Sequence, residues 1–279
     1  MRVMPPLISV IIGTLYLQED LTPLERAVKS ILTQSLSDFE LLICGDGSTE
    51  AANAFLDQCT KEDPRVRLIS SNGKTGLPEK LNGCLAKARG EFIARMDDDD
   101  FSYPDRFEKQ IAFLNANPDI AFVGSNVLLV CNGEPVGRKV LPAAPTVRDF
   151  YMTQPYIHPA LMFRREALKK ICGYSEEHTC VLCEDYDLLL RLYTKGFHGA
   201  NLNEVLLDYT IPETAKGNRT MRHRWNESVT RWRRFYELGV LPRALPYVIK
   251  PLVVGLLPGR LLGKIKKAQR GGCTSWMKS

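Results

Sequence analysis

Short apolar runs alternate with helical patterns through the first hundred residues of the chain. The runs are partly β-branched and occupy residues 7–12, 40–44, 66–70 and 91–96. Between them, apolar residues recur at helical spacing, most clearly over residues 24–32. This alternation predicts an α/β fold in which a parallel sheet with right-handed crossovers is flanked by helices.

The second half of the chain is more mixed. Residues 120–130 predict a longer strand that ends in a turn at residues 131–134, and residues 160–163 predict another strand. Helical periodicity returns over residues 184–194 and 221–238. We therefore expect one α/β domain over residues 1–215 and a helical C-terminal extension over residues 216–279.

Charge is divided unevenly between these two parts. Residues 216–279 hold 15 Lys and Arg against two Glu, whereas the remainder holds 22 Lys and Arg against 30 acidic residues. The apolar clusters of the extension are interrupted by Lys250, Pro251 and Pro258, so they are too short to span a bilayer. Such a segment is expected to lie on an anionic membrane surface, with packing on the α/β domain as the alternative. We expect no nucleic-acid partner, since no nucleic-acid module accompanies the charge.

The eight cysteines show no regular spacing, and a strand pattern begins directly after residues 1–6. We therefore expect no N-terminal signal, reduced thiols and a cytoplasmic protein. A zinc site at Cys172, His178, Cys180 and Cys183 remains an alternative, although no second Cys-x-x-Cys pair accompanies these residues.

Four consecutive aspartates, residues 97–100, follow the apolar run at residues 91–96 and precede a helical pattern that opens at Pro104. The carboxyl ends of strands are the usual place for ligands in an open α/β sheet. Adjacent carboxylates repel one another unless a cation joins them, and Mg²⁺ and Mn²⁺ prefer oxygen ligands. The aspartate run therefore predicts a divalent-metal site.

Further motifs accompany this run in a fixed order. They are Gly45-Asp46-Gly47-Ser48-Thr49 after the second apolar run, the segment 88–96 that leads into the aspartates, Pro104-Asp105-Arg106, and Cys183-Glu184-Asp185-Tyr186-Asp187-Leu188. Taken together, they resemble the family 2 inverting glycosyltransferases over roughly residues 7–210. The resemblance implies the GT-A fold, a Rossmann-like, mixed but mainly parallel sheet. It also implies a UDP-sugar donor bound over the carboxyl ends of the early strands.

The resemblance also assigns donor-binding residues. Asp46 would accept a hydrogen bond from the imide NH of uracil, for which a carboxylate is a suitable acceptor. A simple turn aspartate is the alternative reading of this residue. Thr14, Tyr16 and Asn82 correspond to further positions near the donor.

The Asp-x-Asp motif of the family maps onto residues 97–99 of the aspartate run. Asp99 would be the principal ligand of Mn²⁺ or Mg²⁺, and Asp97 a second one. Asp97 and Asp98 would also meet the donor. The metal would stabilise the departing nucleoside diphosphate as a Lewis acid.

By the same resemblance, Asp185 is the general base that deprotonates the acceptor hydroxyl, with Glu184 beside it. Inversion requires one carboxylate on the side opposite the leaving group. The alternative is that both are first-turn acids that interact with the helix dipole. His158 lies in a segment that borders the acceptor site in the family.

One departure from the family pattern concerns the segment after the last strand. Relatives often carry Tyr-Arg-x-His there, whereas this chain has Tyr209-Thr210-Ile211-Pro212. Metal binding is therefore expected to rest more heavily on the aspartate run and the donor phosphates.

These observations lead us to expect an inverting hexosyltransferase that acts on a lipid-linked glycan in cell-surface polysaccharide (O-antigen or capsule) assembly, at the inner face of the cell membrane. Two alternatives remain. A sugar-nucleotide pyrophosphorylase is expected to show a Gly-rich, basic loop after the first strand, which residues 13–17 do not form. A non-catalytic nucleotide-sugar-binding module would lose nothing when Asp185 is replaced.

Overall fold

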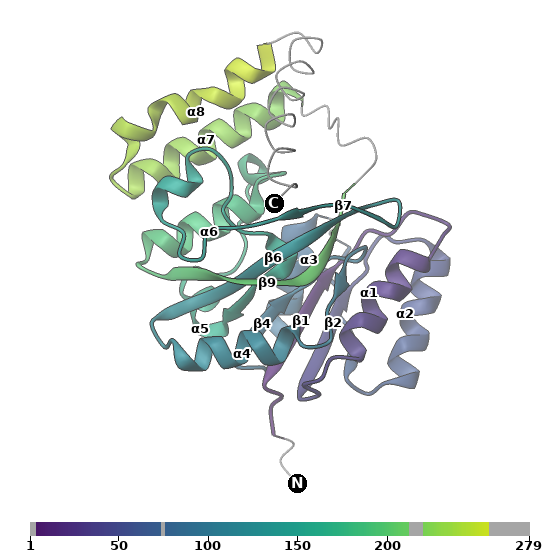
Figure 1. Ribbon diagram of the computed structural model, residues 1–279. Helices are drawn as coiled ribbons and strands as arrows, with labels where there is room; N and C mark the ends of the chain where they lie inside the picture. The colour runs from purple at the N-terminus through teal and green to yellow at the C-terminus, as the bar shows by residue number, and fades with distance from the viewer. Residues whose placement is uncertain (1–3, 74–75, 212–219, 257–279) are drawn as a thin grey trace. The chain divides into compact units, whose positions relative to one another are not determined.

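The computed structural model describes residues 4–73, 76–211 and 220–256. The chain divides into two compact units, of which the first comprises residues 1–176 and 184–216. The second unit comprises residues 177–183 and 217–279. The first unit is an α/β domain built around a sheet, and the described part of the second is mainly a pair of helices (Figure 1).

The regular elements follow the predicted alternation closely in the first hundred residues. The strands are β1 (Ile8–Gly13), β2 (Phe39–Cys44), β3 (Val66–Leu68), β4 (Phe92–Arg95), β5 (Phe101–Ser102), β6 (Ile120–Cys131), β7 (Glu134–Lys139), β8 (Met162–Arg164) and β9 (His198–Thr210). The α-helices are α1 (Thr22–Leu32), α2 (Glu50–Glu62), α3 (Leu77–Lys87), α4 (Arg106–Ala116), α5 (Arg165–Lys170), α6 (Glu184–Thr194), α7 (Met221–Glu237) and α8 (Leu241–Leu256). Short 3₁₀ helices lie at Val147–Phe150, His158–Ala160 and His178–Cys180.

Within the described residues, nine strands form one mixed sheet in the order β3-β2-β1-β4-β8-β6-β9-β5, and β7 pairs with β6. The first four strands are mutually parallel, as predicted: β1 lies between β2 and β4, and β2 pairs with β3. β8 runs antiparallel between β4 and β6, and β6 is parallel to β9. The carboxyl ends of β1, β2 and β4 therefore lie along one edge of the sheet, which is the edge where the predicted donor residues follow these strands.

Both faces of the central strands are covered, which explains why these strands are apolar throughout. Successive side chains point to opposite faces, and Ile8, Val10 and Ile12 share one core with side chains of α1, α2 and α4. Gly13 occupies a position that faces the opposite side of the sheet. A Cβ atom placed on it would lie 3.0 Å from Leu77 of α3. Helix α3 thus lies close against the end of β1, and a larger residue at position 13 would push it away.

A second, aromatic core lies beneath α6. The ring centroid of Phe122 on β6 lies 5.0 Å from that of Tyr156, and the centroid of Phe150 lies 5.1 Å from that of Tyr193 on α6. The hydroxyl groups of Tyr156 and Tyr193 are 2.8 Å apart and share a hydrogen bond. This packing fixes α6, and with it the predicted catalytic residues at its first turn.

The structure contains two strands, β5 and β7, that the sequence did not predict. The aspartate run does not lead straight into a helix, because the two-residue strand β5 pairs with β9 before α4 begins at Arg106. The expected turn at residues 131–134 is confirmed, since Asn132 and Gly133 both have positive φ (52° and 80°), as a two-residue hairpin requires. The turn connects β6 to a strand that was not predicted, β7, most of whose residues are exposed.

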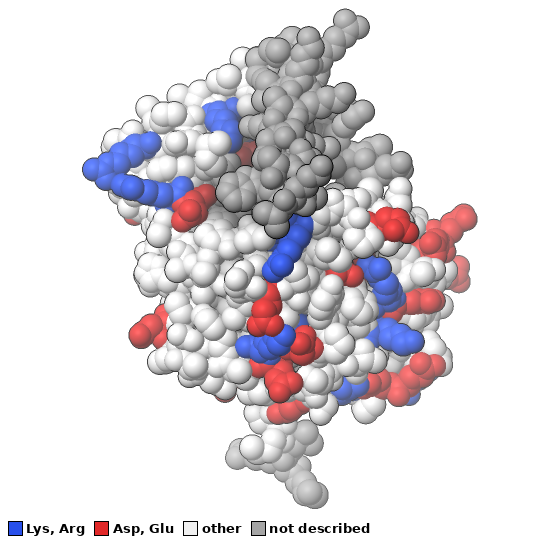
Figure 2. Space-filling model, viewed as in Figure 1, with Lys and Arg blue, Asp and Glu red and all other residues white. Residues whose placement is uncertain are grey.

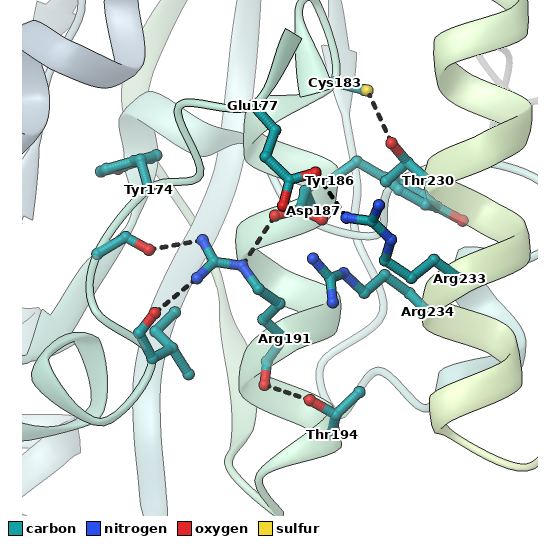
Figure 3. A network of polar contacts seen from close by, with 12 residues as sticks. Tyr174, Glu177, Cys183, Tyr186, Asp187, Arg191, Thr194, Thr230, Arg233 and Arg234 are labelled. Atoms are coloured by element: carbon teal, nitrogen blue, oxygen red, sulfur yellow. Dashed lines mark hydrogen bonds and ion pairs between the residues drawn. The ribbon is translucent and has the colours of Figure 1, made fainter. Parts of the chain in front are cut away.

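In the second unit, α7 and α8 pack against each other. Helix α7 is capped by Thr220, whose Oγ1 accepts a hydrogen bond from the His223 amide at 3.3 Å. The segment 177–183 is attached to α7 by an ion pair of 2.7 Å between Glu177 and Arg233 (Figure 3). No helix in the described part of the chain is long and apolar enough to cross a membrane. Residues 257–279 of the expected extension lie outside the described residues.

Candidate active site

Asp46 lies in the loop that follows β2 and holds it to the loop that follows β3. Its Oδ2 accepts hydrogen bonds from the amide and the hydroxyl of Ser71, at 2.5 and 2.8 Å, and from the Ser70 hydroxyl at 3.1 Å. Burial raises the pKa of Asp46, but these hydrogen bonds outweigh it and lower the pKa overall. Asp46 is therefore an ionised acceptor. Since these bonds converge on Oδ2, a nucleobase would be met by Oδ1.

Thr14 and Tyr16 follow β1, and both are almost completely buried. The Thr14 hydroxyl donates a hydrogen bond to Oδ2 of Asp98, and Nζ of Lys80 on α3 donates to the Thr14 carbonyl oxygen. The Tyr16 ring belongs to the core of the sheet, and its hydroxyl donates to the carbonyl oxygen of Asp20 at 2.6 Å. Thr14 is thus joined to the aspartate run, whereas only 4% of the Tyr16 surface is open to a donor.

The four aspartates of the run differ in their surroundings. Asp97 is ion-paired with Arg95, whose side chain is fully buried. Asp98 is bound by Thr14, as described above. Asp100 is completely buried, and its Oδ1 accepts a hydrogen bond of 2.8 Å from the amide of Thr210 at the end of β9. Asp100 therefore fixes the loop to β9, and Asp99 is the member that lines an open cleft.

Crowding of these carboxylates changes how they ionise. Burial, assisted by the charges of Asp97 and Asp98, raises the pKa of Asp99 to about 6. Burial and the charge of Asp97 also raise the pKa of Asp98, against the hydrogen bond from Thr14. Positive charge lies beneath the run, since the guanidinium of buried Arg106 donates to the Arg95 carbonyl oxygen at 2.8 Å. A cation bound between the carboxylates would relieve their mutual repulsion.

Asp185 lies in the first turn of α6, and its carboxylate is held in a fixed orientation. Nε2 of Gln154 donates a hydrogen bond of 3.0 Å to its Oδ2, and the backbone amide of Tyr186 donates to its Oδ1 at 2.7 Å. Lys139, at the end of β7, lies close enough for the Asp185 charge to raise its pKa, although burial outweighs this and lowers the pKa overall. Neither Gln154 nor Lys139 was predicted from the sequence.

Helix α6 is tied to the segment that precedes Tyr174. Nε of Arg191 donates to Oδ2 of Asp187 at 2.8 Å, one turn earlier on the same helix (Figure 3). Its terminal nitrogens donate to the carbonyl oxygens of Ile171 and Gly173 at 2.6 and 2.5 Å. Arg191 thus has a structural role, since it joins α6 to residues 171 and 173, just before Tyr174.

Two tyrosines lie close to both groups of acidic residues. Burial raises the pKa of Tyr209 on β9, and the charges of Asp97, Asp100, Asp185 and Asp99 raise it further. Burial also raises the pKa of Tyr174, which feels the charges of Asp185, Asp97 and Glu184, although Arg95 opposes them. The first turn of α6 and the aspartate run therefore border a common region, although they are far apart in the sequence.

His158 is buried, and its Nε2 shares a hydrogen bond of 2.8 Å with the Tyr174 hydroxyl. Burial, together with the charge of Arg95, lowers the pKa of His158 well below its usual value, so the ring is neutral. With 7% of its surface exposed, the ring is placed to support Tyr174. This position does not favour the direct acceptor contact expected from the sequence.

Asn82 lies on α3, and its amide is engaged with the segment around Tyr174. Its Oδ1 accepts a hydrogen bond from the Tyr174 amide at 2.8 Å, and its Nδ2 donates to the Tyr174 carbonyl oxygen at 2.9 Å. Asn82 also lines a groove of about 420 Å³ together with Arg165 and Lys169, and Asp99 is not among the residues of that groove. In this structure Asn82 braces the segment around Tyr174, and its role near the donor stays a prediction.

The cleft beside Asp99 has a volume of about 640 Å³. Asp20 and Arg26 line one side of it, and Asn132 and Thr210 contribute from the β6–β7 turn and the end of β9. A volume of this order is typical of small-molecule sites. The cleft places Asp99 where it can meet a bound ligand.

The oxygen ligands of the run suit Mg²⁺ or Mn²⁺, but they do not form a complete site. Among the described residues, no group of three or more His, Cys, Asp or Glu side chains is arranged to hold a metal ion, which also leaves the zinc alternative at residues 172–183 without support. A hard divalent ion is commonly bound by one or two carboxylates together with substrate phosphates and water. Asp99 and Asp97 fit such a shared site, in which the donor would supply the remaining ligands.

Comparison with known proteins gives a consistent result. The sequence pattern described as Glycosyl transferase family 2 matches residues 9–172. The putative glycosyltransferase EpsE of Bacillus subtilis (strain 168) is 30% identical over 263 residues, which cover 94% of each chain. The Escherichia coli UDP-Gal:alpha-D-GlcNAc-diphosphoundecaprenol beta-1,3-galactosyltransferase is 26% identical and covers 94% of this chain and 96% of its own.

Solved structures share the fold at lower identity. Staphylococcus aureus TarS in complex with UDP-GlcNAc superposes with a TM-score of 0.66 at 18% identity, covering 87% of this chain and 72% of the TarS chain. The mannosyltransferase PcManGT of Pyrobaculum calidifontis, in complex with GDP-Man and Mn²⁺, has a TM-score of 0.62 at 17% identity, covering 95% and 80%. Both are glycosyltransferases with the GT-A fold, so the fold expected from the motifs is confirmed.

Proposed function

Because the chain belongs to glycosyl transferase family 2, we propose that it transfers a hexose from a UDP-sugar to a hydroxyl group of an acceptor glycan, with inversion at the anomeric carbon. Family membership makes the chain a glycosyltransferase and removes the pyrophosphorylase alternative. UDP as the nucleotide is supported by the UDP-linked donor named for the related galactosyltransferase. The ionised Asp46, which can accept a hydrogen bond from an imide NH, agrees with this choice.

The observation that supports this proposal is that Asp185 and the aspartate run both raise the pKa of one buried side chain, Tyr209, by their charges. An inverting displacement needs a base on one side of the anomeric carbon and charge stabilisation for the leaving group on the other. Asp185, oriented by Gln154, supplies the first group. Asp97 and Asp99 would hold the divalent ion that supplies the second.

On the leaving-group side, Asp99 and Asp97 would hold Mn²⁺ or Mg²⁺, which when bound supplies Lewis-acid stabilisation of the departing diphosphate. Thr14 orients Asp98 through its hydroxyl, and the buried Arg95 orients Asp97. These contacts fix the carboxylates before the donor arrives, which lowers the reorganisation that donor binding requires.

On the acceptor side, Asp185 takes the proton of the attacking hydroxyl. The oxygen of the acceptor forms a bond to the anomeric carbon as the bond from that carbon to the donor phosphate breaks, and UDP leaves with the electron pair. Half-buried Glu184 lies beside the base and adds negative charge that favours proton uptake. His158 acts indirectly, by positioning Tyr174.

We also propose that the acceptor is a lipid-linked glycan of cell-surface polysaccharide assembly. The E. coli relative that spans almost the whole chain is named for an acceptor sugar on diphosphoundecaprenol. A lipid-linked acceptor requires the enzyme to work at a membrane surface, which is consistent with peripheral attachment at its inner face.

The second unit supports this attachment. Helix α7 exposes Trp225, Trp232 and Tyr236 along one stripe, and α8 exposes apolar residues at positions 245, 249, 253 and 256. Aromatic and apolar stripes next to basic side chains are typical of helices that lie in the interface of an anionic bilayer. On the face seen in Figure 2, the charged side chains over the described part of these helices are mainly basic, whereas those over α1 and α2 are mainly acidic with some basic ones among them.

A donor panel tests the proposed reaction. UDP-, GDP- and dTDP-linked hexoses are offered with Mn²⁺ and a sugar linked to a lipid diphosphate, and the product anomer is assigned by NMR. We expect turnover with a UDP-sugar and a product of inverted configuration. Turnover with GDP-sugars alone would contradict the assignment of UDP, and retention of configuration would contradict the role of Asp185.

A further inference from the structure

Arg26 is an unusual cation within the cleft beside Asp99. It lies on α1 between the buried residues Leu24 and Ala27, and its guanidinium carbon is 5.7 Å from the centroid of the Phe101 ring. Its Nε is shielded from solvent, yet among the described residues it has no hydrogen-bond partner. A buried donor without a partner is costly, so the position is explained if a ligand satisfies it.

Arg26 as a whole is half-buried, and the two fully buried arginines near the aspartate run are already engaged. Arg95 is paired with Asp97, and Arg106 donates to Gln110 and to the Arg95 carbonyl oxygen. No ion pair joins Arg26 to a described residue. A guanidinium has five N–H donors in a fixed planar arrangement, so Arg26 retains most of its capacity for a ligand in the cleft.

The lining of the cleft defines the chemistry of this ligand. Asp99 can bind a cation and Arg26 can bind an anion, and both line the same cleft of about 640 Å³. Asp20 is the other carboxylate that lines the cleft among the described residues. Its Oδ1 accepts a hydrogen bond from the Thr22 amide at 3.0 Å. A diphosphate chelated to a divalent ion satisfies both requirements, since some oxygens bind the metal and others accept bidentate hydrogen bonds from arginine.

We propose that Arg26 binds a diphosphate group in this cleft, which it lines together with Asp99, the proposed metal ligand. This inference rests on the proposed function, which supplies two sources of diphosphate. One is the nucleoside diphosphate of the donor, and the other is the diphosphate that links an acceptor sugar to its lipid. The arrangement of Arg26 and Asp99 suits either source, so the experiment must separate them.

The first arm measures binding of UDP and UMP to the full chain by calorimetry with Mn²⁺. Arg26→Gln should weaken UDP binding about tenfold or more and leave UMP binding nearly unchanged, because only UDP carries the second phosphate. Arg26→Lys, which keeps the charge but loses the planar fork, should restore part of the affinity. Lys29→Gln on the exposed face of the same helix is the matched control and should leave both affinities unchanged.

The second arm compares acceptors, using one sugar linked to a lipid diphosphate and the same sugar on a phosphate-free lipid. If the acceptor is the source, Arg26→Gln raises KM for the diphosphate-linked acceptor alone, and UDP binding stays unchanged. A variant with unaltered UDP binding and unaltered KM for both acceptors would overturn the proposal. UDP binding needs no turnover, so a chain that binds UDP through Arg26 but transfers nothing would refute the proposed function and leave this inference standing.

Discussion

The side-chain amide of Gln154 donates a hydrogen bond of 3.0 Å to Oδ2 of Asp185, across 31 residues of sequence. The backbone amide of Tyr186 binds the other carboxylate oxygen at 2.7 Å. These two bonds restrict rotation of the carboxylate, which in the proposed mechanism directs a lone pair at the acceptor hydroxyl. Gln154 is a positioning residue, because it acts through Asp185.

Gln154→Met keeps the length of the side chain and removes the hydrogen bond. We expect kcat to fall about tenfold, because a misdirected base is less efficient, while the dissociation constant for UDP stays unchanged. Steady-state kinetics and UDP calorimetry measure the two effects separately. Gln58→Met, on the exposed surface of α2, serves as the control. A parallel loss of UDP affinity would point to a general structural defect.

Asp99→Asn removes the one carboxylate of the aspartate run that lines the cleft among the described residues. Transfer should fall by about a hundredfold or more, and Mn²⁺ should no longer strengthen UDP binding, because an amide is a weaker ligand for a hard divalent ion. Asp105→Asn alters a partly exposed aspartate nearby, paired with Lys109, and should keep the metal effect. If Mn²⁺ strengthened UDP binding equally in Asp99→Asn and the wild type, the ligand would have to be sought elsewhere in the run.

Glu40 provides a test of the fold that is independent of activity. Its carboxylate is 2% exposed and accepts hydrogen bonds from Ser9 at 2.8 Å, Arg67 at 2.6 Å and the Arg89 amide at 2.8 Å. Burial raises the pKa of Glu40, but these hydrogen bonds outweigh it and lower the pKa overall. A lowered folded-state pKa stabilises the protein above the pKa of the unfolded chain, and this contribution is lost as the pH falls through the folded-state value.

Glu40→Gln should therefore lower the free energy of unfolding by about 2 kcal/mol at pH 7, since the Ser9 hydroxyl and the Arg89 amide lose a charged acceptor, whereas the Arg67 and Arg89 side chains are partly exposed. The difference between wild type and variant should shrink as the pH is lowered from about 5 towards 3. Urea unfolding at several pH values measures both quantities. A difference that grew as the pH fell would contradict the assignment.

Membrane attachment is tested on α7. Replacing both Trp225 and Trp232 with Ser should weaken binding to vesicles that contain anionic lipid by about tenfold, because two interfacial aromatic anchors are lost. Transfer to a water-soluble acceptor should be retained. Val136 and Met152, which are also exposed, provide a matched double replacement in the α/β unit. Equal vesicle binding by the wild type and the tryptophan variant would exclude this stripe as the contact.

A strand could be predicted from the sequence when both of its faces are buried. Strands β1, β2 and β4 were recognisable because both of their faces are covered, so their residues are almost all apolar. Strand β7 has mostly exposed residues and carries no such signal. Strand β5 has only two residues and exists because Phe101 and Ser102 pair with β9, a long-range contact that no local pattern reveals.

The site shows the same limit. The carboxylates were found because they occur in an ordered set of motifs, whereas Gln154 and Arg26 belong to no such set and are brought to the site by tertiary packing. The type of a residue also did not reveal whether its side chain is buried. Tyr16 and His158 were expected to meet substrates, but both rings are packed inside the α/β unit. A sequence motif locates a segment, and packing decides which side chain of that segment is accessible.

The central claim is that Asp185 acts as the base in a site whose donor side is formed by the aspartate run. The most direct measurement is donor binding and single-turnover transfer by Asp185→Asn, with UDP-sugar and Mn²⁺ in excess. We predict a UDP dissociation constant within about twofold of the wild type and a transfer rate lowered by about a thousandfold. A transfer rate close to that of the wild type would contradict the account.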